Sequence, residues 1–173
     1  MKRIFCMLLV LVIFISGCAT VQSIIKSTFP YTATLTIPNG TKSEELKTVT
    51  SVASSLDQIF GENGSTDLIK DVKVGAVKLV ASNPTNQNLG IFKSVKVFVV
   101  SENGGEVMVG SRSDVSENIG NSLVLDIDNS RFVDNYIKGS SLKIRMEYLL
   151  RNNLTSDVSV RVAINFSASP NPK

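Results

Sequence analysis

The chain has 173 residues, of which 43% are hydrophobic, 19% charged and 6% aromatic, so it holds enough apolar material for one packed domain. It contains no histidine, which excludes catalytic triads and zinc sites that depend on this residue. The formal net charge is +3, and removal of the two basic residues of a predicted leader leaves 16 basic against 15 acidic residues, a balance that does not indicate a nucleic-acid-binding surface.

The first 17 residues have the three parts of a secretory signal peptide. Lys2 and Arg3 form a basic start, residues 4–15 form an unbroken apolar run, and Ser16 and Gly17 are the small residues before a cleavage site. As a helix, this run would span only about 18 Å, whereas the hydrocarbon core of a bilayer is about 30 Å thick. We therefore expect a cleaved signal and not a permanent transmembrane segment.

The end of the leader, Ile15-Ser16-Gly17-Cys18, resembles the lipobox of bacterial lipoproteins. The resemblance implies cleavage between Gly17 and Cys18, a diacylglyceryl thioether on the sulfur of Cys18 and, in many bacteria, a further acyl chain on the new amine. Each buried methylene adds about 0.8 kcal/mol of membrane affinity, so two or three acyl chains hold a protein stably. An ordinary cleaved signal is the alternative.

The cysteine content agrees with this interpretation. Cys6 would be removed with the leader and Cys18 would be alkylated, so the mature chain would have no thiol for a disulfide. Ala19 is not the aspartate that retains lipoproteins at the inner membrane of enterobacteria, and no acidic run follows. The resemblance therefore implies the cell envelope, at the periplasmic face of an outer membrane where the organism has one.

Patterning divides the mature chain into a lipidated tether, 18–30, and a single domain, 31–173. Apolar residues alternate with threonine over 31–37, which is the period of a half-buried strand, and Pro38-Asn39-Gly40 has the composition of a turn. A further strand is predicted over 46–52.

From Val52 the apolar spacing becomes that of a short helix through Phe60, with Ser54 or Ser55 as its N-cap and Gly61 at its end. We interpret its apolar stripe as packing on the sheets, with a partner-binding face as the alternative. This helix is the first of two predicted in the connections.

A strand is predicted over 72–81, where the apolar positions change phase between Val74 and Val77. One extra residue is needed to keep both sets on the same face, so the pattern predicts a β-bulge near Gly75. Asn83-Pro84 is expected to close the strand.

Residues 94–101 and 106–112 are predicted to form a hairpin around Asn103-Gly104, the dipeptide of a two-residue type I′ turn. Both faces of this hairpin are apolar, so we expect both to be covered. Cover by the rest of the protein is the first interpretation, and an apolar ligand groove is the alternative. The predicted register pairs Val100 with Val107 and Phe98 with Val109.

A strand over 123–127 and a second short helix over 132–137 follow, with Asn129 or Ser130 as the helix cap and Gly139 at its end. The next two segments, 142–150 and 158–166, alternate most regularly. We predict that they pair side by side, with Leu150 opposite Val158 and Glu147 opposite Arg161 on the solvent face.

These elements predict a mainly β fold, an antiparallel immunoglobulin-like β-sandwich of seven or eight strands with two short helices in connections. The stretch from Ser82-Asn83-Pro84 through Phe92-Lys93-Ser94-Val95-Lys96-Val97 and on to the rest of the charged hairpin is similar to uncharacterised Bacteroides-type lipoproteins of one β-sandwich domain. It is similar, more distantly, to the immunoglobulin-like domains of plant desiccation proteins of the late-embryogenesis-abundant class. The resemblance implies the fold and adds almost nothing about activity.

Two acidic residues are the first candidates for chemistry. Asp126 and Asp128 would project to the same face of a strand and could share a cation or divide acid and base roles. Capping of the following helix is the preferred interpretation. A calcium loop from Asp126 is excluded because Arg131 and Ile137 stand where its glycine and glutamate would be.

Lys143, Arg145 and Arg161 are the second candidate, a basic strip suited to anionic lipid head groups. Glu147 interrupts it, so a solvated sheet face is preferred. No catalytic residue, metal ligand set or cofactor motif is predicted.

The function expected from the sequence is therefore that of a membrane-anchored envelope lipoprotein, whose domain is a non-enzymatic binding or structural module. A carrier or sensor of an apolar, lipid-like ligand is the alternative, and an enzyme is the third reading because acid and base residues are scarce. The expected partners are the membrane, through the anchor, and an envelope protein or apolar ligand, with no nucleic acid.

Overall fold

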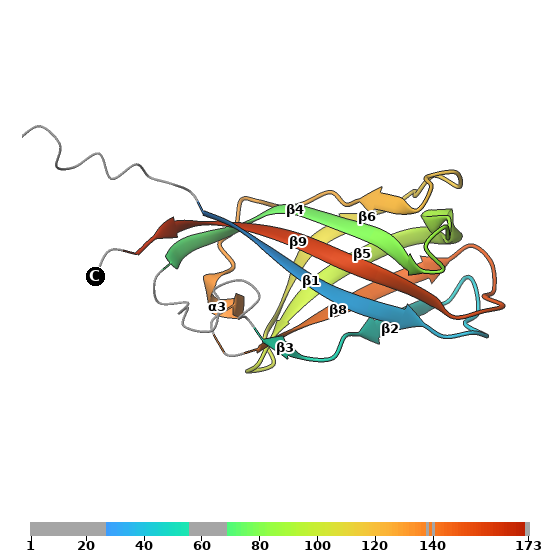
Figure 1. The fold of residues 1–173 in the computed structure, drawn as a ribbon, viewed down its shortest axis with the longest axis horizontal. Coiled ribbons are helices and arrows are strands. Elements are labelled where there is room, and N and C mark those ends of the chain that lie inside the picture. Colours follow the sequence, from blue (N-terminus) through green and yellow to red (C-terminus); the bar gives the residue numbers. More distant parts are fainter. Residues whose placement is uncertain (1–26, 56–68, 138, 140, 172–173) are drawn as a thin grey trace, which may run out of the picture.

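The computed structural model describes residues 27–55, 69–137, 139 and 141–171, which form a β-sandwich with little helix (Figure 1). Two short helical segments lie in connections, η3 (Leu89–Ile91) and α3 (Asp134–Ile137). The strands are β1 (Ser27–Ile37), β2 (Leu46–Thr50), β3 (Ser54–Ser55), β4 (Ile69–Asn83), β5 (Phe92–Ser101), β6 (Glu106–Arg112), β7 (Ser122–Val124), β8 (Ser141–Leu150) and β9 (Val158–Pro170).

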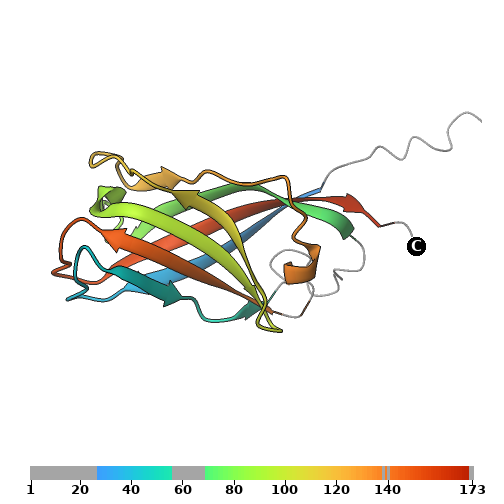
Figure 2. The same cartoon turned by 180° about the vertical axis from the view of Figure 1, so that it is seen from behind.

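The strands form two antiparallel sheets, which confirms the mainly β sandwich. The first sheet has the order β1-β9-β4-β7 and the second the order β2-β8-β5-β6, with β3 also paired to β8. Figure 1 looks onto the first sheet and Figure 2 onto the second. Alternate side chains of both sheets, such as Ile144 and Val162, are fully buried between them, as expected of strands with one solvated face.

Three strand ends mark what we call the proximal end of the sandwich. Ser27 at the start of β1 lies opposite Ala168, and Ile69 at the start of β4 lies opposite Pro170 at the end of β9. β1 therefore begins inside the segment predicted as a tether. Its first residues already pair with β9.

The predicted β-bulge in β4 is confirmed at Gly75. Val74 lies opposite Phe166 and Ala76 lies opposite Asn165, so Gly75 is the extra residue between two consecutive partners on β9. As a result, Val74 and Val77 both face the core. The strand ends at Asn83, as predicted from the following proline.

The β5–β6 hairpin is confirmed, but its register and turn differ from the prediction. Phe98 lies opposite Met108, and Val100 lies opposite Glu106. Ser101 and Gly105 close a three-residue loop in which Gly104 has φ +81, because one residue with positive φ is sufficient in this turn. The predicted pairs Phe98–Val109 and Val100–Val107 are therefore wrong.

The prediction that the last two long strands pair side by side is wrong. β8 belongs to the second sheet, between β2 and β5, whereas β9 belongs to the first sheet, between β1 and β4. The loop over 151–157 crosses from one sheet to the other, so the apolar sets of β8 and β9 face the same core from opposite layers. Glu147 consequently pairs with Lys96, and Arg161 lies opposite Thr34.

The predicted helices have different outcomes. Val52 is 85% exposed and Ser54–Ser55 form β3, so the helix does not begin at Val52, and the part of that prediction over 56–61 lies outside the described residues. The second helix is confirmed as α3, shortened to Asp134–Ile137, with Val133 and Ile137 buried; its predicted cap at Asn129 or Ser130 is wrong, because the helix begins four or more residues later. The strand predicted over 123–127 is β7, shortened to Ser122–Val124.

Among the described residues, no helix has the length and apolar character needed to span a membrane.

Candidate functional site

Four loops gather at the end of the sandwich opposite Ser27, and we call this the loop end. They connect β1 to β2, β4 to β5, β6 to β7 and β8 to β9, and each begins and finishes at this end because the strands are antiparallel. They lie together at the right of Figure 1. The loops span residues 38–45, 84–91, 113–121 and 151–157.

The side chain of Asn88 fastens two of these loops. Its Oδ1 accepts hydrogen bonds from the backbone N–H of Gly90 at 2.9 Å and of Gly120 at 3.1 Å. Its Nδ2 donates to the carbonyl oxygen of Glu117 at 2.6 Å. Nearly the full capacity of one amide is thus spent on holding 84–91 against 113–121.

Arg151 fastens a third loop to the same two. Its Nε donates to the carbonyl oxygen of Gly90 at 3.1 Å, and its guanidinium also donates to the carbonyl oxygen of Val115. Gly90 is packed so tightly that a β-carbon there would lie 1.9 Å from the carbonyl oxygen of Glu117. The loop end is therefore a closely fitted structure and not a set of independent loops.

The 38–45 loop is held to the 151–157 loop by backbone and side-chain bonds. Gly40 N–H donates to the carbonyl of Leu154 at 3.0 Å, and Leu154 N–H donates to the carbonyl of Thr41 at 3.0 Å. Ser43 N–H donates to Oδ1 of Asn153 at 2.8 Å. Residues of this loop contribute to the lining of two surface hollows.

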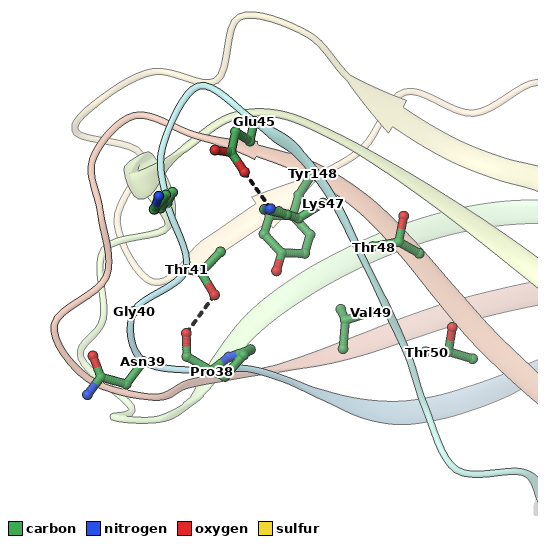
Figure 3. Close-up of a pocket in the computed structure, with 11 residues that line it drawn as sticks. Pro38, Asn39, Gly40, Thr41, Glu45, Lys47, Thr48, Val49, Thr50 and Tyr148 are labelled. Carbon is green, nitrogen blue, oxygen red and sulfur yellow. Dashed lines mark hydrogen bonds and ion pairs between the residues drawn. The ribbon is translucent and has the colours of Figure 1, made fainter.

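The first hollow has a volume of about 720 Å³ and lies between the 38–45 loop and β2 (Figure 3). Its lining is mostly polar, and Glu45 forms an ion pair with Lys47 within it. The lining residues are Pro38, Asn39, Gly40, Thr41, Lys42, Glu45, Lys47, Thr48, Val49, Thr50 and Tyr148.

Tyr148 supplies the aromatic group of the first hollow, but its ring is buried and packs edge-on against Phe92, with ring centroids 5.8 Å apart. Burial raises the pKa of its hydroxyl, and a hydrogen bond with Thr41 and the charge of Lys47 oppose this shift. A neutral hydroxyl at the edge of the hollow can donate or accept one hydrogen bond to a ligand.

The second hollow has a volume of about 500 Å³ and is lined by residues of all four loops and by Lys93 of β5. Glu44, which has φ +58, forms an ion pair with Lys93 at 3.2 Å. Glu117 forms another with Arg151 at 3.7 Å. The lining residues are Glu44, Asn88, Gly90, Ile91, Lys93, Glu117, Asn118, Arg151 and Asn152.

Both hollows are lined by hydrogen-bonding groups and by paired carboxylate and cationic side chains. Within the described ranges, no cluster of three or more acidic, histidine or cysteine side chains is positioned to hold a metal ion. Sequence reasoning did not find this site because its residues come from four loops with no common motif. The polar composition of 84–88 was the one local signal.

The predicted site residues Ile15, Ser16, Gly17 and Cys18 lie outside the described residues. The two aspartates do not form a joint site. Asp126 pairs with Arg112 at 3.2 Å, and Asp128 accepts hydrogen bonds from the backbone N–H and hydroxyl of Ser130, which lowers its pKa.

The basic strip is also not assembled, because Arg161 belongs to the first sheet and Arg145 to the second. Arg145 is held by Glu106 and Glu147. The second face of the β5–β6 hairpin has no sheet over it: the guanidinium of Arg145 lies 3.9 Å from the ring centroid of Phe98, and Met108 is 45% exposed.

No protein family and no curated protein match the chain. Solved structures to which the chain is weakly similar include turnip yellow mosaic virus, with 11% identity, a TM-score of 0.32 and coverage of 87% of this chain and 97% of that chain. Infectious bursal disease virus (Gx strain) has 11% identity and a TM-score of 0.36, with coverage of 85% of this chain and 42% of that chain. A carbohydrate-binding module of the β-sandwich superfamily has 9% identity and a TM-score of 0.30, with coverage of 84% of this chain and 57% of that chain.

Proposed function

We propose that the chain is a lipid-anchored lipoprotein of the bacterial cell envelope whose β-sandwich acts as a non-enzymatic binding module. The observation that carries the proposal is the order of a basic start, a short apolar run and Ile15-Ser16-Gly17-Cys18 at the beginning of the chain. The anchor is the thioether on Cys18, and no cofactor takes part. In a cell with two membranes, the anchor lies in the outer one, with the domain in the periplasm.

The geometry of the domain supports a binding role directed away from the bilayer. The nine residues from Cys18 to Lys26 reach at most about 30 Å when fully extended, so the proximal end stays near the membrane. The loop end, with both hollows, is at the far end of the sandwich. Loops on a rigid β scaffold are where binding residues of such folds concentrate.

A carrier of an apolar ligand is the second candidate. The apolar residues that suggested it are divided by the structure: Val95, Val97 and Val99 are in the core, and Phe98 lies under Arg145 on the outer face.

We propose that this β-sandwich is of the immunoglobulin-like type, as the sequence predicts.

The anchor is tested by a Cys18→Ser variant expressed beside the unchanged chain in the same bacterial host. Cells grown with radioactive palmitate should label the unchanged chain, and the variant should lose the label and move from the membrane fraction to the soluble fraction. A Cys6→Ser variant is the matched control, because it alters the leader and should keep the label. Label that persists in Cys18→Ser, or membrane association without any label, would reject lipidation at this residue.

A further inference from the structure

The residues that line the second hollow indicate which class of ligand it binds. This inference rests on the proposed function as a binding module. The walls of the hollow are fixed before any ligand arrives. Asn88 and Arg151 together fasten the 84–91, 113–121 and 151–157 loops, and Gly90 packs directly against the backbone of Glu117. A preorganised wall loses little conformational entropy when a ligand binds.

The charges in the hollow cancel in pairs. Lys93 lies 3.2 Å from Glu44, and Arg151 lies 3.7 Å from Glu117. An anionic or cationic ligand would have to displace a carboxylate or a cationic side chain that is already paired. A ligand without net charge can instead bridge these groups, accepting from the cation and donating to the carboxylate of the same pair.

Two amides add hydrogen-bonding capacity that is still open. The exposed side chains of Asn118 and Asn152 line the hollow, and neither has a hydrogen-bonding partner within the part of the chain that the structure describes. Each amide offers a donor and an acceptor side by side. Ile91, which is partly buried, adds an apolar surface to the lining.

We propose that the second hollow binds an uncharged saccharide. Adjacent hydroxyl groups of a sugar each donate and accept, which suits a lining that combines carboxylates, cationic side chains and amides, and Ile91 offers an apolar surface for its C–H face. A volume of about 500 Å³ lies in the range of small-ligand pockets. The described lining offers no exposed aromatic ring for stacking, so binding through hydrogen bonds alone is expected to be weak.

The test uses the full chain carrying Cys18→Ser, titrated with a β-1,4-linked tetramer of N-acetylglucosamine and, separately, with maltotetraose. In NMR spectra, at least one sugar should shift the side-chain amide signals of Asn118 and Asn152. Asn118→Ala and Asn152→Ala should each weaken binding by roughly 3- to 10-fold, the effect of one lost hydrogen bond. Asn86→Ala, an exposed change on the same end outside the lining, should leave it unchanged.

Three results would overturn the proposal. The first is that neither sugar shifts these amides at concentrations up to about 10 mM, where even weak pockets fill. The second is that the shifts are confined to the first hollow, around Thr41 and Tyr148. The third is that inorganic phosphate displaces the sugar, which would mean that the hollow selects anions. None of these depends on lipidation, so they are distinguishable from failure of the palmitate experiment.

Discussion

Arg145 and Glu106 form a two-bond ion pair on the outer face of the second sheet, with Nε to Oε2 and Nη2 to Oε1 both at 2.8 Å. The same guanidinium lies over the ring of Phe98 and 3.7 Å from Glu147. Arg145 is 20% exposed, so this group is better shielded from solvent than an ordinary surface pair. One arginine thus links β8 to β5 and β6.

We expect Arg145→Lys to lower the free energy of unfolding by about 1–2 kcal/mol. Lysine keeps the charge but cannot make two parallel bonds to a carboxylate or lay a planar group on Phe98. Urea denaturation monitored by circular dichroism measures the change. Arg161→Lys is the matched control, because Arg161 is an exposed arginine on the first sheet with no ion pair in the described structure, and it should cost less than about 0.5 kcal/mol. Equal losses would contradict the prediction.

Gly90→Ala should destabilise the domain by about 1–3 kcal/mol and disturb the loop end. The new β-carbon would lie 1.9 Å from the carbonyl oxygen of Glu117, and the obstructing group is backbone, which cannot rotate away. Gly105→Ala is the control, since the nearest atom there is 3.4 Å away, an ordinary contact. Thermal unfolding of the two variants compares them. A Gly90→Ala protein as stable as Gly105→Ala would show that the loops are not tightly fitted.

Stability should fall as the pH rises above 10.0, the ordinary pKa of tyrosine. Burial raises the pKa of Tyr31 and of Tyr148 in the folded state, so above this pH the unfolded chain loses protons that the folded chain retains. The contribution of these two tyrosines to the free energy of unfolding is complete below pH 10.0. It is lost as the pH rises through their raised pKa values in the folded state.

The measurement is the free energy of unfolding in urea at several alkaline pH values. Tyr31→Phe and Tyr148→Phe should each have a shallower pH dependence than the unchanged chain, even though Tyr31→Phe also loses the hydrogen bond to the carbonyl of Leu142. Parallel curves for all three proteins would mean that these hydroxyls do not cause the alkaline loss.

Deletion of Gly75 should prevent stable folding. Without the bulge, the residues before or after it must turn their side chains outward, and Val72 and Val74 or Val77, Leu79 and Ala81 would leave the core. Gly75→Ala should be tolerated with a loss below about 1 kcal/mol, because its β-carbon would lie 3.3 Å from the carbonyl oxygen of Asn165 and φ is not positive. A deletion variant that is folded in its NMR spectrum and unfolds cooperatively would refute the role of the bulge.

Local patterns predicted the long strands well because alternate residues of each are buried. Alternation located β1, β5, β8 and β9, and a phase change located the bulge at Gly75. These signals depend on neighbours along the chain, and the sequence holds them directly.

Pairing between strands was not predictable in the same way. The apolar sets of β8 and β9 satisfy a side-by-side register and a face-to-face arrangement equally well, since both bury the same residues. The choice is made by the strands that compete for each edge: β5 pairs with β8, and β1 and β4 pair with β9. The loop end was missed for a related reason, because Asn88 and Arg151 meet their partners only after both sheets are in place.

The position of β9 has a consequence for how the domain is assembled. Among the described strands, β1 and β4 lie on either side of β9, and both pair with β9 and not with each other. Until that last segment is available, two long threonine- and valine-rich strands have no central partner. The first sheet can therefore close only after β9 is available, so its pairing depends on contacts that are distant in sequence.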